Sequence, residues 1–214
     1  MQKELDFLCL AEKLKLEMRH SWLSDGKRQE SVAEHSWRLA LMALRYASQL
    51  DQQVNVEKCL KLALIHDLAE AITGDIPVFQ HQTNLAQQNK FENEYSAMKQ
   101  IQTMLNDQNG DELLDLWLEF ENQTSYESKF IKALDKLEVF IQHNEAPLTT
   151  WEEREKRMLF QKKWLIRHCE FDSFLNALCL SVIAQGVEKL KNAGDNIAEI
   201  IQSAKDEEKN FSIV

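Results

Sequence analysis

The chain contains 214 residues with a net charge of −10, and 44% of its residues are apolar. A chain of this length fits one domain, and its apolar share excludes global disorder. It contains only five glycines and two prolines, whereas average usage would give roughly 26 in total. Because the turns of β-rich folds depend on these two residues, the shortage predicts an all-α fold. We expect a single-domain multi-helix bundle over residues 1–214.

Charge and motif content exclude several classes of function. An acidic surface repels nucleic-acid phosphates, which disfavours a partner of DNA or RNA. The sequence contains neither a P-loop nor a GxGxxG motif, so the chemistry of those nucleotide-binding folds is not expected. It has no run of 18 apolar residues, so no membrane span is expected. The four cysteines have no CxxC spacing and the N-terminus does not resemble a signal peptide, which predicts a cytoplasmic, reducing location.

Periodic apolar residues predict eight or nine helices in succession. They are expected over residues 4–18, 31–50, 55–74, 89–105, 111–121, 125–143, 151–168 and 172–190, with a C-terminal helix after 191 and a frayed end over 205–214. Ser31 followed by Glu34 predicts a capping box, and Asn55 predicts a second helix start. Residues 25–30 are expected to form a polar turn. Residues 75–85 are expected to be irregular, and they could cover a pocket.

Two histidines and one aspartate lie on faces that are otherwise apolar. His35 falls in the row of Val32 and Leu39, and His66 shares a face with Leu62. Each histidine taken alone could be a core side chain satisfied by one hydrogen bond. Asp135 lies between apolar residues of another expected helix, where a carboxylate needs a cation, a metal or a good hydrogen bond. A salt bridge to Lys132 or Lys136 would also satisfy it.

Together these positions predict a metal site. His66 is followed directly by Asp67, so two imidazoles and two carboxylates come from three helices. This donor set suits Mn²⁺, Fe²⁺, Co²⁺, Zn²⁺ or Ni²⁺. Helical bundles build such sites from side chains that face one another in the core. The wide separation of the four residues along the chain means that spacing alone cannot establish the site.

Longer blocks of the sequence resemble a known family. His35, the dipeptide His66-Asp67 and Asp135 match the H…HD…D pattern of HD-domain metal-dependent phosphohydrolases. The blocks ESVAEHSWRLA, LALIHDLAEAITGDIP, KFENEYSAMKQI and KFIKALDKLEVFIQ are similar to successive parts of one branch of that family. That branch holds small stand-alone 5′-deoxynucleotidases and similar HD-domain-containing proteins. The resemblance covers about residues 5–190.

The resemblance implies which residues hold the metal and assist the reaction. His35, His66, Asp67 and Asp135 match the four metal-ligand positions, for one divalent ion of open identity (Mn, Co, Mg, Zn, Fe or Ni). Glu70 matches the acid that orients or deprotonates the attacking water. Asp75 matches an acid that faces the substrate. Glu70 could otherwise be a solvated helix residue, and Asp75 could be only a turn residue after Gly74.

It also implies residues that bind the substrate. Arg19 and Trp22 match an Arg-x-x-Trp element, in which the arginine meets phosphate and the tryptophan packs on the nucleoside. Arg38 is a further candidate for phosphate. Arg19 and Trp22 could instead be a surface pair, and Arg38 could extend to solvent or pair with Glu34.

The implied activity is metal-dependent hydrolysis of (deoxy)nucleoside 5′-monophosphates to nucleoside and phosphate. Ala71 after Glu70 counts against a guanosine-tetraphosphate hydrolase, and the sequence has no GYP element. A deoxynucleoside triphosphate or cyclic-nucleotide substrate stays open, as does a non-enzymatic metal- or nucleotide-binding module. The remaining histidines, among them His143 and His168, match no ligand position. The resemblance also implies a homodimer.

Overall fold

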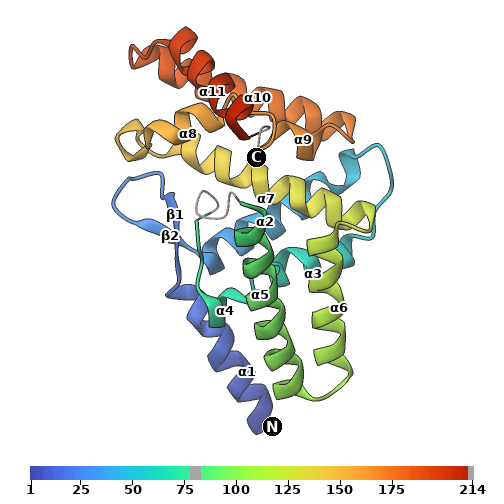
Figure 1. Cartoon of the computed structure of the whole chain (residues 1–214). Coiled ribbons are helices and arrows are strands. Elements are labelled where there is room, and N and C mark those ends of the chain that lie inside the picture. Colours follow the sequence, from blue (N-terminus) through green and yellow to red (C-terminus); the bar gives the residue numbers. More distant parts are fainter. Residues whose placement is uncertain (78–82, 212–214) are drawn as a thin grey trace. The chain divides into compact units, whose positions relative to one another are not determined.

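The computed structural model describes residues 1–77 and 83–211, with side chains up to residue 208. These residues are almost entirely helical (Figure 1), which confirms the predicted all-α class. The α-helices are α1 (Gln2–Glu12), α2 (Val32–Tyr46), α3 (Val56–Ile65), α4 (Glu70–Thr73), α5 (Asn84–Leu105), α6 (Gln108–Asn122), α7 (Tyr126–Glu145), α8 (Glu153–Met158), α9 (Ile166–Cys169), α10 (Ser173–Asn192) and α11 (Ile197–Phe211). None of the helices within the described ranges is long and apolar enough to cross a bilayer.

The chain divides into two compact units. The first comprises residues 1–20, 29–45 and 54–131, and the second comprises residues 21–28, 46–53 and 132–214. Helix α7 begins in the first unit and continues into the second. The single domain expected over residues 1–214 stays a prediction.

The first unit is built on a core to which α1, α2, α3, α5 and α6 contribute. Trp117 of α6 and Met98 of α5 are fully buried within it, and α5 and α6 run side by side (Figure 1). Asp107 caps α6 by accepting a hydrogen bond from the backbone N–H of Gly110 at 3.0 Å. A Cβ on Gly110 would lie 3.1 Å from the carbonyl oxygen of Gln102, so the glycine permits the close approach of the two helices.

The second unit packs α8, α9, α10 and α11 on one another (Figure 1). Asp172 caps α10, as the expected start at residue 172 predicts, by accepting from the N–H of Leu175 at 2.9 Å. The same carboxylate accepts from the N–H of Asp51 at 2.7 Å, which ties the 46–53 segment to the start of α10.

Two expected features near the ends of the chain differ from the structure. The first helix ends at Glu12, and a two-stranded sheet follows, in which β1 (Met18–Trp22) pairs with β2 (Gln29–Ser31). The turn between them closes through a hydrogen bond from the N–H of Gly26 to the carbonyl of Leu23. The strands are too short to give a clear alternating pattern. Residues 205–211, expected to be frayed, belong to α11, and 212–214 lie outside the described residues.

Two expected helices are each divided, so the described residues form eleven α-helices where eight or nine were expected. The helix expected over 151–168 becomes α8 and α9. Between them, the buried Gln161 donates to the carbonyl of Ala204 at 3.2 Å and accepts from Nε1 of Trp164 at 2.6 Å. The bond to Ala204, 43 residues further along the chain, outweighs local helix continuation. The helix expected over 55–74 becomes α3 and α4, with a turn at residues 66–69.

Candidate metal centre

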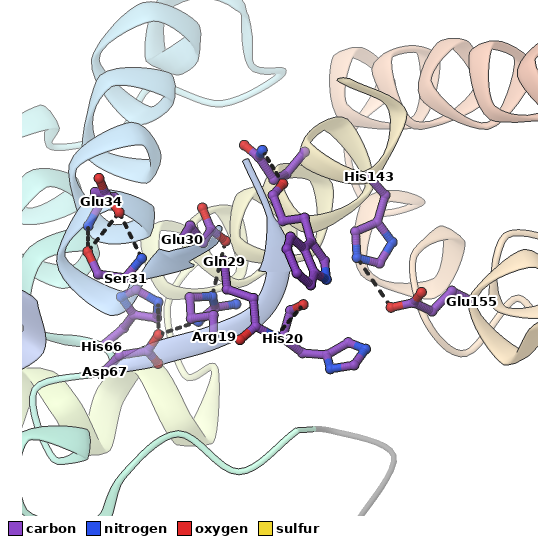
Figure 2. Close-up of polar contacts among 12 residues, drawn as sticks. Arg19, His20, Gln29, Glu30, Ser31, Glu34, His66, Asp67, His143 and Glu155 are labelled. Carbon is purple, nitrogen blue, oxygen red and sulfur yellow. Dashed lines mark hydrogen bonds and ion pairs between the residues drawn. The ribbon is translucent and has the colours of Figure 1, made fainter. Parts of the chain in front are cut away.

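Helix α2 places His35 in the core of the first unit. Its start is fixed by the predicted capping box, in which the N–H of Ser31 donates to Oε2 of Glu34 at 2.8 Å and the N–H of Glu34 donates to Oγ of Ser31 at 3.3 Å (Figure 2). Val32 and Leu39 are fully buried on the same side of α2. His35 is also fully buried, so this imidazole is held within a packed apolar face.

His66 and Asp67 lie in the turn that follows α3. Hydrogen bonds from residue i to i−3, such as the N–H of Glu70 to the carbonyl of Asp67 at 3.1 Å, tighten the chain here. The ring of His66 is almost fully buried, and its Nδ1 lies 2.9 Å from the carbonyl oxygen of Ala63. A carbonyl can only accept, so Nδ1 carries the proton. Nε2 lies on the other side of the ring.

Nε2 of His66 faces the carboxylate of the next residue. Nε2 of His66 lies 3.0 Å from Oδ2 of Asp67 and has no hydrogen-bond partner of good geometry within the described residues. Two ligand atoms, each about 2.1 Å from one metal ion and at right angles, would lie about 3.0 Å apart. A nitrogen oriented by a bond from its other ring atom to a backbone carbonyl is also the usual setting of a metal-binding histidine. The pair therefore fits a divalent cation.

His35 stands beside this pair. The ring centroids of His35 and His66 are 5.3 Å apart, and one ring nitrogen of each lies within 4.8 Å of the other. Phe120 closes the other side of His66, with ring centroids 5.2 Å apart in an edge-on arrangement. The structure thus brings three of the four predicted ligands together within the first unit, against an apolar wall.

Arg19 holds Asp67 in place (Figure 2). Nη1 of Arg19 donates to Oδ2 of Asp67 at 2.9 Å, and its Nε lies 3.4 Å from Oε1 of the buried Glu30. Burial raises the pKa of Asp67, but His66 and Arg19 outweigh it and hold that pKa below its usual range. The carboxylate is therefore ionised, as a metal ligand must be. The resemblance had placed Arg19 opposite phosphate, and the structure adds that it also orients a predicted ligand.

Glu70 begins α4 and is buried. Its Oε2 has no hydrogen-bond partner within the described part of the chain. Burial and the negative charges of Asp67 and Asp75 raise the pKa of Glu70 well above its usual value. Glu70 is therefore not the solvated helix residue considered above.

Asp75 follows Gly74, whose φ of +75° requires the left-handed freedom of glycine. The N–H of Asp75 donates to Oε1 of Glu17 at 2.9 Å, which fixes the chain as it leaves α4. Burial raises the pKa of the half-buried Asp75, Arg19 opposes the rise, and Asp67 adds to it. Asp75 thus belongs to the same electrostatic group as Asp67 and Glu70. Residues 78–82, part of the stretch expected to cover a pocket, lie outside the described residues.

The other predicted site residues have separate surroundings. Arg38 is half-buried on α2, one turn after His35. Trp22 is half-buried in the second unit, where its carbonyl accepts a hydrogen bond from Nε2 of Gln142 at 2.6 Å. Asp135 is buried on α7 and pairs with Nζ of Lys136 at 3.0 Å, so the salt bridge considered above does form.

Sequence reasoning missed three charged residues near this group. Glu30 contacts Arg19, and Lys90 pairs with the buried Glu94 on α5. The spacing of Lys90 and Glu94, four residues apart on a helix, was a visible signal of a paired face. Glu30 gave no such signal, because its partner lies in a different strand.

The sequence model of the HD domain family matches residues 11–168, a range with stretches from both units. Human 5′-deoxynucleotidase HDDC2 is 40% identical over 142 residues, which cover 66% of this chain and 67% of the human protein. The zebrafish protein of that name is 41% identical over 68% of this chain and 70% of its own. The 5′-deoxynucleotidase YBR242W of Saccharomyces cerevisiae is 34% identical over 64% of this chain and 58% of its own.

Solved structures agree with the sequence comparisons. The crystal structure of a predicted metal-dependent phosphohydrolase from Magnetospirillum magnetotacticum has a TM-score of 0.73 and 26% identity, covering 88% of this chain and 95% of its own. The PH0347 protein from Pyrococcus horikoshii has a TM-score of 0.61 and 27% identity, covering 82% and 98%. The resemblance inferred from the sequence blocks is confirmed.

Proposed function

Because this chain belongs to the HD domain family, we propose that it is a metal-dependent phosphohydrolase that converts (deoxy)nucleoside 5′-monophosphates to nucleoside and phosphate. The observation that carries the proposal is the approach of Nε2 of His66 to Oδ2 of Asp67, at 3.0 Å, beside the ring of His35 and the buried Glu70. Relatives from human to yeast that bear the name 5′-deoxynucleotidase support the choice of substrate.

The proposed metal ligands are His35, His66, Asp67 and Asp135. A bound divalent ion (Mn, Co, Mg, Zn, Fe or Ni) would polarise a phosphoryl oxygen and lower the pKa of a bound water towards neutrality. The buried His35 and the ionised Asp67 support the assignment within the first unit. Asp135 enters as the fourth ligand through its match to the family pattern and its burial on α7.

Glu70 is the proposed base. Its carboxylate would take the proton of the attacking water as the water oxygen bonds to phosphorus. The bond from phosphorus to the 5′ oxygen then breaks, and that oxygen receives a proton to leave as the nucleoside hydroxyl. Asp75, in the same electrostatic group, is proposed to face the substrate and to assist the proton transfers.

Arg19, Trp22 and Arg38 are the proposed substrate-binding residues. A guanidinium has five N–H donors in a planar fork, so Arg19 can hold Asp67 and still offer charge to a phosphate oxygen. Trp22 would pack on the nucleoside, and Arg38 would add a second guanidinium near the phosphate.

A phosphate-release screen tests the proposal. The full chain would be assayed with every ribo- and deoxyribonucleoside 5′-monophosphate, with deoxynucleoside triphosphates and with cyclic nucleotides, across several divalent metals. We expect metal-dependent release from monophosphates, with deoxyribonucleotides preferred. Turnover confined to triphosphates or cyclic nucleotides would support the alternative substrates. Saturable nucleotide binding without any phosphate release would identify a binding module and overturn the enzymatic proposal.

A homodimer and a cytoplasmic location are further parts of the proposal. Trp37, Leu41 and Leu44 form a stripe on α2 and are 66%, 51% and 58% exposed. Apolar stripes of this kind commonly mark protein–protein contacts, and a second copy of the chain would cover this one. Light scattering of the wild type and Leu41→Lys tests it, since a dimer through this face should dissociate. The free cysteines support a reducing compartment.

A further inference from the structure

Helix α5 carries an ion pair with a buried carboxylate, which the proposed mechanism does not use. Nζ of Lys90 pairs with Oε1 of Glu94, one turn further along the helix. Glu94 is only 6% exposed. Ion pairs of this spacing normally lie on the solvated face of a helix and contribute little. Burying the carboxylate of Glu94 has a desolvation cost. The place of this pair on the helix therefore needs an explanation other than stability.

The pair lies beside the acids of the candidate metal centre. Helix α4, which begins with Glu70, packs against α5 within the first unit. Lys90 interacts electrostatically with Asp67 and Glu70, and it also acts on Asp75. Arg19 acts on the same three carboxylates. Lys90 and Arg19 therefore supply positive charge to one acidic group from two different elements.

This arrangement fits a ligand with concentrated negative charge. A phosphate that approaches Asp67, Glu70 and Asp75 is repelled by them, so its binding requires fixed cations as well as a metal. An ammonium group has three N–H donors, so Lys90 can bond Glu94 and still donate to an oxygen of a ligand. Glu94 also favours the charged form of Lys90, because its negative charge lies at bonding distance.

We propose that Lys90 binds an oxygen of the substrate phosphate and that Glu94 is the positioning residue that aims it. The inference rests on the proposed phosphohydrolase function and adds to it a phosphate-binding cation on α5. In the alternative, the pair serves only to neutralise the acids and to hold α5 in place.

Lys90→Gln, with Lys99→Gln as the matched control, separates these roles. Lys99 lies on the same helix, is exposed, and bonds Gln102 at 2.6 Å. The measurements are KM, kcat, the inhibition constants of inorganic phosphate and of the product deoxynucleoside, and the metal content of the protein. We expect Lys90→Gln to raise KM and the phosphate inhibition constant about ten- to a hundredfold, the range for one charge-assisted hydrogen bond. Deoxynucleoside inhibition and metal content should not change.

Two further variants test the positioning role. Lys90→Arg keeps the charge and should stay within a few-fold of the wild type for inorganic phosphate. Glu94→Gln should weaken phosphate inhibition, and Glu94→Asp should restore part of it. Equal losses for phosphate and deoxynucleoside, loss of the metal, or unchanged phosphate inhibition in Lys90→Gln would each overturn the proposal.

Calorimetry distinguishes this inference from the proposed function itself. Inorganic phosphate would be titrated into the manganese-loaded full chain, wild type and Lys90→Gln. If the wild type hydrolyses no nucleotide, the proposed function fails, but a weaker phosphate affinity in the variant would still support the role of Lys90. If turnover is present and phosphate affinity is the same in both proteins, only the role of Lys90 is wrong.

Discussion

Two buried histidines, His143 and His66, each lie beside a carboxylate (Figure 2). The two carboxylates have different further partners. In the second unit, Nε2 of His143 lies 3.5 Å from Oε1 of Glu155. Glu155 also accepts the N–H of Glu152 at 2.6 Å in the capping box of α8, so it completes a helix end. In the first unit, Oδ2 of Asp67 lies 3.0 Å from Nε2 of His66 and accepts a hydrogen bond from Nη1 of Arg19 at 2.9 Å. Burial is common to both pairs, whereas the His66–Asp67 pair also has the ring of a second histidine, His35, beside it.

The largest expected effect comes from breaking each pair in turn. His66→Ala or Asp67→Ala should abolish metal binding and turnover together, because each removes a proposed ligand. His143→Ala should retain both and lower the melting temperature, because it removes packing against Trp151, whose Nε1 donates to the carbonyl of His143 at 2.8 Å. Metal analysis, phosphate release and thermal melts measure the three effects. A metal-free His143→Ala that remains folded would contradict the comparison.

Substitution of Glu70 and of Glu155 should give the next largest effect. Glu70→Gln should lower kcat about 10²–10⁴-fold, the range for loss of a general base, while the metal remains bound. Because the pKa of Glu70 is raised by burial and by Asp67, the neutral glutamine should not lower the free energy of unfolding. Glu155→Ala should show the reverse, with kcat preserved and a loss of about 1–3 kcal/mol in the free energy of unfolding from its broken cap bond. A fully active Glu70→Gln would remove its assigned role.

These pairs also show what the sequence can predict. The starts of α2, α3 and α10 follow from Ser31, Asn55 and Asp172, since capping acts within three residues and leaves a local pattern. The ligand candidates were visible as polar residues on apolar faces. The division at Gln161 was not visible, because the bond to Ala204 that favours it spans 43 residues. Lys90 and Glu94 were visible as a pair, but their proximity to Glu70 depends on how α4 packs against α5.

His168 shows how burial acts on a histidine when positive charges surround it. Burial lowers the pKa of His168 to about 4, and the positive charges of Lys136, Arg167 and Lys132 add to the effect, while Asp135 opposes it. The folded protein therefore holds His168 neutral where the unfolded chain, with a pKa near 6.5, takes up a proton. The stability that this group contributes is complete above pH 6.5 and is lost as the pH falls towards 4.

We expect the free energy of unfolding to fall by about 1–3 kcal/mol between pH 6.5 and 4, because the pKa shift of His168 is large but partly screened by solvent. Urea unfolding of the wild type and His168→Gln between pH 7 and 4.5 measures it. The variant should lose less stability than the wild type as the pH falls. Parallel slopes for the two proteins would show that His168 does not titrate in this way.

The smallest expected effect concerns the cap that precedes His35. Ser31→Ala removes the hydroxyl that accepts the N–H of Glu34 and should lower the free energy of unfolding by about 1 kcal/mol. Metal affinity should not change, because the buried Val32 and Leu39 fix the face of α2 from which His35 projects. Ser181→Ala, an exposed mid-helix change on α10, is the matched control and should not destabilise the protein.

Titration calorimetry with Mn²⁺, beside urea unfolding of both variants, decides this point. If metal affinity fell in step with stability, the cap of α2 would be part of the metal centre, and Glu34 would serve His35 as well as the helix. If only stability falls, Glu34 resembles Glu155, a carboxylate that completes a helix end. Asp67 would then remain distinct from both, because its Oδ2 lies 3.0 Å from Nε2 of His66, the nitrogen proposed to bind the metal.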